Sequence, residues 1–122
     1  MSIQPYTEQR PWGSFVCFIH NSKSTVKILH VKAGEAFSLQ YHHHREEFWY
    51  ILEGKAKVTV GDTTIEAGPG DQFTVPVETP HRVEGITDVS VLEVSEGDFD
   101  RDDIVRLDDK YGRPSPLEDT HQ

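Results

Sequence analysis

The chain has 122 residues, of which 35% are hydrophobic and 27% are charged, and its formal net charge at pH 7 is -9. This length allows one folded core and excludes two domains of ordinary size. The negative charge argues against a nucleic-acid backbone or an anionic membrane surface as the main partner, although a few arginines in a cleft would suffice for a small phosphorylated ligand.

The cysteine content and the apolar runs indicate where such a chain works. Cys17 is the only cysteine, which excludes an intrachain disulfide and gives no sign of an oxidising compartment. The first residues lack the apolar segment of a secretory signal, and no apolar run approaches the ~20 residues of a membrane span. We expect a soluble, cytoplasmic protein with no nucleic-acid or membrane partner.

Short strands separated by turn residues follow one another along most of the chain, which predicts an all-β fold. Glycine and aspartate at positions 61 and 62 stand between two strand-like runs and predict a two-residue hairpin, because glycine accepts the positive φ of a primed turn. No segment keeps an apolar period of 3.6 residues, so a long helix is not expected. A sandwich, a jelly roll and a closed barrel remain as options. The predicted strands cover residues 15–19, 25–31, 37–42, 48–52, 56–60, 72–75, 81–83 and 89–94.

The chain changes character after Ser95, where aspartates alternate with arginines and lysines. A solvated surface whose charges partly balance one another explains this segment most simply. Its few apolar members, at positions 99, 104, 105, 107 and 111, could attach it to the barrel. We predict one domain over 1–122, with a core at about 10–113 and a flexible tail at 114–122.

Four side chains that can bind a metal stand among glycines and prolines: Gln40, His42, Glu47 and His81. Successive residues of a strand point to opposite faces, so Gln40 and His42 share a face, and neighbouring strands can supply Glu47 and His81 from across a barrel. A solvated turn, for the histidine cluster, and a half-buried structural residue, for His81, are the plain alternatives. The pair His42 and His44 also shares a strand face and remains a second arrangement.

These residues resemble the cupin superfamily. Its first motif is a glycine, two ligand positions two residues apart, a glutamate and a closing glycine, and its second motif is a glycine, a proline and a histidine. The resemblance implies a double-stranded β-helix, which is a jelly-roll barrel, and a homodimer. The motif positions are filled here by Gly34, Gln40, His42, Glu47, Gly54, Gly70, Pro76 and His81.

More narrowly, the chain is similar to the type II mannose-6-phosphate isomerase family over residues 10–113. The resemblance rests on the segments RPWG at 10–13, SLQYHHHR at 38–45, DDIVR at 102–106 and YGR at 111–113. In many proteins such a domain follows a mannose-1-phosphate guanylyltransferase domain. The chain departs from the usual residues of these motifs at Ala33, Phe48, Glu78 and Gly85.

An amide oxygen, two imidazoles and one carboxylate suit one divalent first-row ion, with one or two coordination positions left open. Zn²⁺ is the first choice, and Mn²⁺, Fe²⁺, Ni²⁺ and Co²⁺ are alternatives. An open position permits Lewis-acid catalysis. Gln40 distinguishes this set from the three histidines and one glutamate that oxygen-activating cupins generally present.

The resemblance implies isomerisation of mannose 6-phosphate to fructose 6-phosphate, or a related sugar-phosphate conversion. The general base is predicted to be Glu93, among apolar neighbours that raise its pKa, or His44, beside the ligands. An arginine partner for Glu93 and a place at the rim for His44 are the plain alternatives. The phosphate is assigned to Arg113, with help from Arg45, although the neighbour of an inward-facing ligand tends to face outward.

Two other functions remain open from the sequence. A sugar-binding or regulatory cupin without catalysis would account for Phe48 and for the absence of a fused transferase domain. A metal-dependent dioxygenase is less favoured because of Gln40. Strand addition at the sheet edges would suit the expected homodimer.

Overall fold

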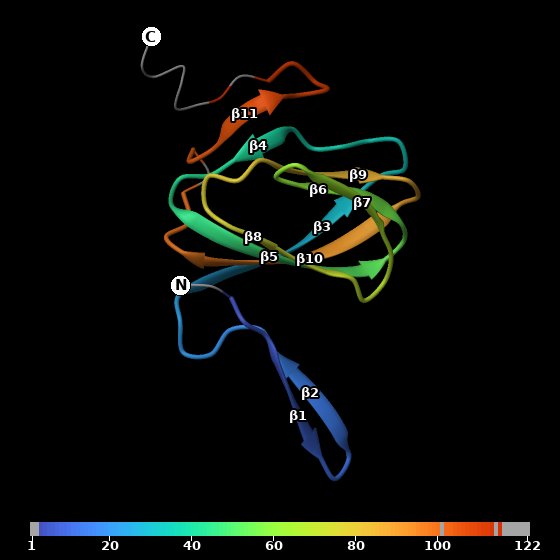
Figure 1. Ribbon diagram of the computed structural model, residues 1–122, viewed down its shortest axis with the longest axis vertical. Helices are drawn as coiled ribbons and strands as arrows, with labels where there is room; N and C mark the ends of the chain where they lie inside the picture. The colour runs from blue at the N-terminus through green and yellow to red at the C-terminus, as the bar shows by residue number, and fades with distance from the viewer. Residues whose placement is uncertain (1–2, 101, 114, 116–122) are drawn as a thin grey trace.

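Figure 1 shows the computed structural model of the chain, which describes residues 3–100, 102–113 and 115. Within these residues all regular structure is β, which confirms the predicted fold class, and no helix has the length and apolarity to cross a bilayer. The eleven strands are β1 (Tyr6–Arg10), β2 (Gly13–Cys17), β3 (Ser24–Val31), β4 (Leu39–Tyr41), β5 (Arg45–Glu53), β6 (Ala56–Val60), β7 (Thr63–Ala67), β8 (Gln72–Val75), β9 (His81–Gly85), β10 (Val89–Gly97) and β11 (Val105–Asp108).

The strands form two facing sheets and a separate hairpin. One sheet has the order β3-β10-β5-β8 and the other has the order β11-β4-β9-β6-β7, and every pairing between these strands is antiparallel. Strands β1 and β2 pair only with each other and extend away from the sheets (Figure 1). The layered body therefore holds the core, and the N-terminal hairpin stands outside it.

The core lies between the two sheets and is built by alternation along the strands. In β5 the side chains of Glu47, Trp49 and Ile51 point inward and are almost completely buried. They meet small and branched residues of the opposite sheet, among them Val58 and Val83. Alternation along β5 thus places the acidic side chain of Glu47 in the interior, next to the apolar core.

A second apolar cluster covers part of the outer face of the first sheet. Phe48 of β5 and Val94 of β10 are opposite each other in the ladder and point away from the core. Ile3, near the N-terminus, and Phe18, after the hairpin, pack against them. Strand β5 is consequently buried on both faces, which explains its continuous apolar run at 48–52.

The sequence predicted most of these strands within a few residues. Gly61 has φ +60° in the tight turn between β6 and β7, as the hairpin prediction requires. The strand predicted at 37–42 is shorter, since β4 ends at Tyr41 and the chain bends through residues 42–44. Strands β1 and β11 were not predicted.

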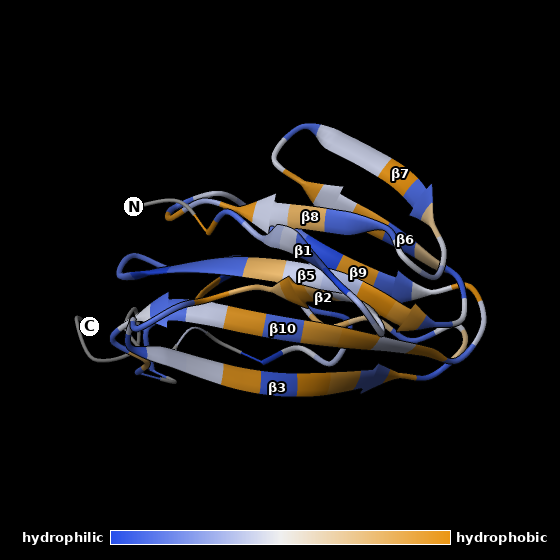
Figure 2. Ribbon diagram, turned by 90° about the horizontal axis from the view of Figure 1, so that it is seen from below, coloured by the Kyte–Doolittle hydropathy of each residue, from blue (hydrophilic) through white to orange (hydrophobic). Residues whose placement is uncertain are grey.

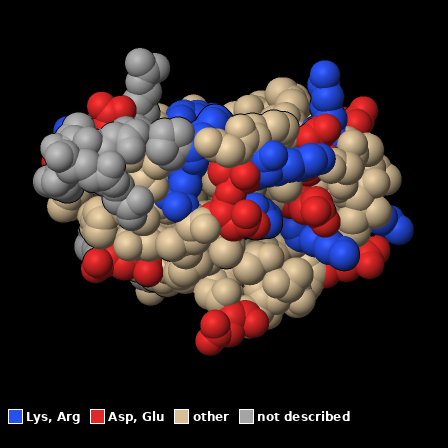
Figure 3. All heavy atoms as spheres, turned by 90° about the horizontal axis from the view of Figure 1, so that it is seen from above, with Lys and Arg blue, Asp and Glu red and all other residues tan. Residues whose placement is uncertain are grey.

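The acidic C-terminal segment folds across the second sheet through β11, which pairs with β4. Acidic and basic side chains lie side by side on the face seen from above (Figure 3). Within this segment Arg113 pairs with Asp109, whereas Asp108 and Lys110 pair with residues outside it, Arg82 and Glu35. Of the tail predicted at 114–122, the structure describes only Ser115, a buried residue whose hydroxyl accepts a hydrogen bond from the Arg106 N–H. The rest of that tail lies outside the described residues.

Glu78 occupies a backbone conformation that favours glycine, with φ +57°. Its N–H donates a hydrogen bond to the carbonyl of His42 at 2.7 Å, so this turn supports the chain beside a candidate ligand. Left-handed backbone is unfavourable for a residue with a Cβ atom. A glycine at position 78 would adopt this backbone conformation without that cost.

We expect Glu78→Gly to raise the free energy of unfolding by about 0.5 to 1 kcal/mol, because the left-handed strain is removed. Urea unfolding of the metal-free protein measures the change. The control is Glu66→Gly in strand β7, where an extended backbone gives glycine no advantage and the same substitution should destabilise. A loss of stability in Glu78→Gly would show that the side-chain contact between Glu78 and His43 at 3.4 Å outweighs the strain.

Candidate metal centre

Three of the predicted ligands converge inside the barrel. Their nearest donor atoms all lie within 4.8 Å of one another, and His42, Glu47 and His81 are almost completely buried. His42 Nε2 is 3.7 Å from Glu47 Oε2, and His81 Nε2 is 3.5 Å from Glu47 Oε1. A carboxylate from β5 of the first sheet therefore faces two imidazole nitrogens from the second sheet, one just after β4 and one at the start of β9.

Backbone carbonyls set the protonation of both imidazoles. His42 Nδ1 lies 2.6 Å from the carbonyl oxygen of Asp103, and His81 Nδ1 lies 2.9 Å from that of Thr79. A carbonyl accepts only, so each Nδ1 carries the proton and each Nε2 presents a lone pair toward Glu47. Burial, with the nearby charge of Arg45, lowers the pKa of His42 to about 3, and burial lowers that of His81 to about 4. Both rings are neutral at pH 7, which is the form that binds metals.

Two buried atoms in this cluster lack a hydrogen-bond partner within the described residues: Glu47 Oε1 and His81 Nε2. Both are acceptors, and they face each other at 3.5 Å. Buried acceptors without a donor are rare in proteins and costly. The chemistry of these donors, a carboxylate and two neutral imidazoles, fits a divalent first-row cation.

Gln40 reaches the same region from β4, where its backbone is opposite His81 in the ladder with β9. Its side-chain oxygen accepts a short hydrogen bond from the buried hydroxyl of Ser38. The amide lines the hollow that Glu47 and His81 also line. Gln40 thus lies beside the cluster formed by His42, Glu47 and His81.

Arg45 points into the barrel, whereas the sequence analysis expected a neighbour of an inward-facing ligand to point outward. It shares the inward face of β5 with Glu47, is 7% exposed, and so does not face outward. Its Nε donates to Glu47 Oε2 at 3.1 Å, and its Nη2 donates to His42 Nε2 at 3.2 Å. The guanidinium therefore satisfies two of the lone pairs that a metal ion would need. Burial still raises the pKa of Glu47, although Arg45 opposes this effect.

The hollow beside the cluster has a volume of about 250 Å³. At its edge the ring of Phe99 lies between two cations, with Lys27 Nζ 4.0 Å and the Arg45 guanidinium carbon 4.3 Å from the ring centroid. Glu93 also lines this hollow. Two positive groups, Lys27 and Arg45, and one acid, Glu93, thus line the hollow beside the ligand cluster.

Glu93, the first candidate for the base, is buried and accepts a hydrogen bond from Trp49 Nε1 at 3.3 Å. Burial, followed by the charge of Glu47, raises the pKa of Glu93 to about 7. Within the described residues, the hydrogen bond to its carboxylate comes from the Trp49 indole and not from an arginine, so the alternative of a direct arginine pair does not describe Glu93. Its role as a base stays a prediction.

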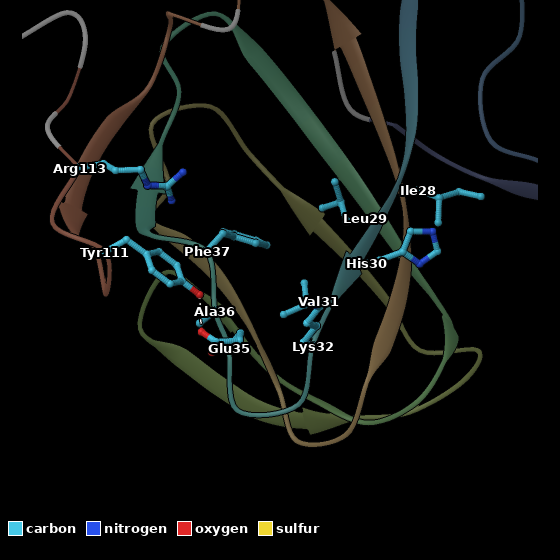
Figure 4. Close-up of a pocket in the computed structure, with 10 residues that line it drawn as sticks. All are labelled: Ile28, Leu29, His30, Val31, Lys32, Glu35, Ala36, Phe37, Tyr111 and Arg113. Carbon is cyan, nitrogen blue, oxygen red and sulfur yellow. Dashed lines mark hydrogen bonds between the residues drawn. The ribbon is translucent and has the colours of Figure 1, made fainter.

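His44 and Arg113 lie elsewhere. The alternation that grouped His44 with Gln40 and His42 stops where β4 ends, and His44 is exposed and outside the lining of the ligand hollow. Arg113 bonds to Asp109 and lines a neighbouring hollow of about 490 Å³ beside β3 (Figure 4). The two hollows share only Leu29 and Phe37, so Arg113 is not next to the ligand cluster.

Asp103 holds the ligand loop in place, and the sequence analysis missed it. Its carboxylate accepts hydrogen bonds from the backbone N–H groups of His43 and His44, each at 2.9 Å, while its carbonyl orients His42. Burial opposes ionisation of Asp103, but these two N–H groups hold its pKa below the ordinary value. The apolar residues Ile104 and Val105, which follow it and are buried, were the signal that this acidic segment docks on the barrel.

Comparison with known proteins identifies relatives. The family described as Mannose-6-phosphate isomerase C-terminal matches residues 3–109. Mannose-1-phosphate guanylyltransferase 2 of Escherichia coli O157:H7 is 40% identical over 105 residues, which cover 84% of this chain and 22% of that protein. The alginate biosynthesis protein AlgA of Pseudomonas aeruginosa is 38% identical over 107 residues, which cover 85% of this chain and 22% of that protein. The chain therefore spans about a fifth of the length of the curated relatives it matches.

A solved structure with a similar fold is oxalate decarboxylase from Bacillus subtilis, a cupin. It has a TM-score of 0.64 and 24% identity, and the match covers 70% of this chain and 24% of that one. At this identity the likeness concerns the fold alone. Together with the sheets described above, it confirms the predicted cupin fold.

The predicted function has to be corrected. The sequence analysis assigned interconversion of mannose 6-phosphate and fructose 6-phosphate, but the relatives carry the names of mannose-1-phosphate guanylyltransferases and polysaccharide biosynthesis proteins. The sequence similarity on which the prediction rested is therefore shared with proteins named for nucleotidyl transfer to a sugar phosphate. The broader prediction, that the relatives are enzymes of sugar-phosphate metabolism, is confirmed.

Glu93→Gln tests the charge balance of this interior. The pKa of Glu93 rises from 4.5 to about 7, so between these values the folded state binds more protons than the unfolded state, and stability is lost as pH rises through that window. Gln keeps an acceptor for Trp49 and cannot ionise. We expect the variant to match the parent near pH 4.5 and to exceed it at pH 8 by up to roughly 3 kcal/mol.

Urea unfolding of the metal-free protein at both pH values measures this difference. The exposed Glu66 on β7 supplies the control, because Glu66→Gln should change stability by similar amounts at both pH values. An equal effect of Glu93→Gln at pH 4.5 and pH 8 would mean that Glu93 is ionised in the folded protein throughout.

Arg45→Met tests whether the guanidinium competes with a cation. Removing a positive charge that bonds to Glu47 and His42 should tighten Zn²⁺ binding by roughly 10-fold or more, because a cation a few ångströms away is repelled by it. Competition with a chromophoric chelator measures the dissociation constant. Arg82→Met, which removes an arginine bonded to Phe37 and Asp108, is the control and should leave the constant unchanged. Weaker binding in Arg45→Met would instead make Arg45 a support of the ligand set.

Proposed function

The chain belongs to the family described as Mannose-6-phosphate isomerase C-terminal, and from this we propose that it is a cupin domain that binds one divalent metal ion and, beside it, a phosphorylated mannose used in guanylyl transfer. The observation that carries the proposal is the pair of buried acceptors, Glu47 Oε1 and His81 Nε2, which face each other without a donor. A bound cation would satisfy both atoms.

The metal ligands in this proposal are Gln40, His42, Glu47 and His81. Fixed tautomers support the two imidazoles, because each Nδ1 donates to a backbone carbonyl and leaves Nε2 free to bind. The bond from Ser38 to the Gln40 oxygen supports the amide as a directed, weak ligand. Zn²⁺ fits a set of two imidazoles, one carboxylate and one amide oxygen best, with Mn²⁺, Fe²⁺, Ni²⁺ and Co²⁺ as alternatives.

The bound ion would supply a positive charge and an open coordination position for a sugar oxygen. The chain's own groups do the rest of the work at this site. Lys27 and Arg45 present cations to a phosphate at the edge of the hollow, where Phe99 now lies between them. Glu93 accepts a hydrogen bond from a sugar hydroxyl when it is ionised, and it donates one when it is protonated.

The names of the relatives support the choice of sugar phosphate. Several are mannose-1-phosphate guanylyltransferases, and mannose 1-phosphate is the acceptor that this name specifies. This chain covers only 22% of such a protein, so the proposal assigns it the binding of the sugar phosphate and leaves the transfer step to the remaining part of those relatives. The hollow of about 250 Å³ limits the ligand to a small molecule.

Binding of mannose 1-phosphate to the purified, Zn²⁺-loaded chain tests the proposal. We expect one metal ion per chain, binding of mannose 1-phosphate that is lost on chelation, and at least roughly 10-fold weaker binding of mannose, which lacks the phosphate. Metal analysis and isothermal titration calorimetry supply the two measurements.

Lys27→Met should weaken mannose 1-phosphate binding by roughly 10-fold and leave metal content unchanged, because it removes a phosphate contact and no ligand. Lys57→Met, which changes an exposed lysine of β6, is the matched control and should bind as the parent does. The proposal fails if mannose and its phosphate bind equally, or if the metal-depleted chain binds the phosphate as well as the loaded chain.

A further inference from the structure

The Arg45 guanidinium is bonded to the same atoms that would bind a cation. Its Nε donates to Glu47 Oε2, and its Nη2 donates to His42 Nε2. A neutral imidazole has a single lone pair, which it uses either to accept a hydrogen bond or to coordinate a metal. A cation on His42 and the hydrogen bond from Arg45 therefore exclude each other.

Strand β5 explains why an arginine lies so close to the ligands. It begins with three charged residues at 45–47 and continues with mostly apolar ones, and Figure 2 shows this change from hydrophilic to hydrophobic along the strand. Alternation places Arg45 and Glu47 on the same inward face, where both are buried. A buried guanidinium that loses its acceptors needs others, because the desolvation of an unpaired charge is costly.

Two further contacts hold the guanidinium at the edge of the hollow. Its Nη1 donates to the carbonyl oxygen of Asp100 at 3.1 Å, and the group lies against the ring of Phe99, with 4.3 Å between the guanidinium carbon and the ring centroid. Neither contact involves a candidate ligand. Arg45 can therefore stay at the hollow after its bonds to the ligands are broken.

The two donors that point at the ligands form one unit. In a guanidinium, Nε–H and one N–H of Nη2 lie parallel along one edge, and such an edge binds two oxygens of a phosphate at once. This edge now donates to Glu47 and His42. Once released, it is a ready-made phosphate fork in a side chain that already lines the hollow.

Lys27 provides the contrast within the same hollow. Its ammonium group lies 4.0 Å from the centroid of the Phe99 ring, and within the residues that the structure describes it forms no hydrogen bond or ion pair. Lys27 is therefore available to an anion whether or not a cation is bound. Arg45 is available only when its bonds to Glu47 and His42 are broken.

We propose that Arg45 couples metal binding to phosphate binding: a cation on Glu47 and His42 releases the Nε and Nη2 donors, which then bind the phosphate of a sugar phosphate in the hollow. The coupling rests on the proposed function, which supplies both ligands. It is reciprocal, because a phosphate that holds Arg45 away from Glu47 and His42 must tighten cation binding by the same factor.

The charge of the ion gives a second, weaker reason for coupling. A divalent cation attracts a phosphate and repels the guanidinium through space, and an open coordination position can also hold a ligand oxygen. These effects do not need Arg45. The share that belongs to Arg45 is the part of the coupling that disappears when its side chain is replaced.

Zn²⁺ dissociation constants, measured by chelator competition with and without saturating mannose 1-phosphate, test the proposal. We expect mannose 1-phosphate to tighten Zn²⁺ binding to the parent by a factor at least roughly 10-fold larger than the factor in Arg45→Met. Lys27→Met should bind mannose 1-phosphate more weakly with and without metal, so its coupling factor should equal that of the parent. Arg82→Met, which changes an arginine bonded to Phe37 and Asp108, is the control with an unchanged factor.

The Nε–H of Arg45 reports its release directly. Its signal in a ¹H–¹⁵N NMR spectrum, identified by its absence in Arg45→Met, should shift when Zn²⁺ is added and shift again with mannose 1-phosphate. This measurement uses the parent chain, so it holds even if Arg45→Met does not fold, in which case triple-resonance spectra assign the signal. In Lys27→Met the first shift should persist.

Equal coupling factors in the parent and Arg45→Met would overturn the proposal, since the guanidinium would then have turned to another acceptor such as Glu93. An Arg45 Nε–H signal that Zn²⁺ leaves in place would overturn it as well. Both results leave the proposed function standing. If mannose 1-phosphate binds to no form of the chain, the proposed function fails and the coupling fails with it.

Discussion

A carboxylate buried between two imidazole lone pairs is the constraint on which this structure depends. Glu47 is placed in the interior by the alternation of β5, the same periodicity that buries Trp49 and Ile51. A buried charge must be compensated by an opposite charge or by hydrogen bonds, because the desolvation penalty is otherwise larger than the stability of the fold. In this structure the compensation comes from Arg45, which leaves one oxygen of Glu47 without a donor.

The surrounding structure serves to keep these groups in register. Asp103 fixes both the bend at 42–44 and the tautomer of His42. The carbonyl of Thr79 fixes the tautomer of His81. The C-terminal segment that carries Asp103 is held by the pairing of β11 with β4 and by ion pairs on the surface. A buried polar cluster loses stability if any member moves, because its hydrogen bonds are then broken without replacement by water. Contacts outside the cluster hold its members in position.

Sequence reasoning recovered the features that follow from local patterns. Alternation and turn residues located most strands of both sheets. Of the four side chains singled out by motif spacing, His42, Glu47 and His81 cluster in the fold, and Gln40 lines the hollow beside them. It failed where the partner is remote. Strand β11 exists because it pairs with β4, more than 60 residues earlier, and no local signal marks it in an aspartate-rich segment. The orientation of His44 and Arg45 depended on where β4 ends, and a bend of three residues reversed both expectations.

The function was the least predictable part, because a similar metal-binding cupin can serve different proteins. The site residues indicate which ligands can bind, but they do not identify the reaction. The relatives, which are named for guanylyl transfer, replaced the isomerisation predicted from the sequence. Phe48 illustrates the limit. Its difference from the related family suggested a changed pocket, yet it points outward into the cluster with Ile3 and Val94 and has no place at the site.

The contact between His42 and Asp103 joins residues 61 positions apart and has a consequence for synthesis of the chain. While the ribosome is still adding residues before 103, the imidazole has no carbonyl to fix its proton, and the loop at 42–44 has no carboxylate to cap it. All the strands of the first sheet are by then complete, since β10 ends at Gly97. The strands of the first sheet can consequently pair before Asp103 is available to orient His42 and to cap the bend at 42–44.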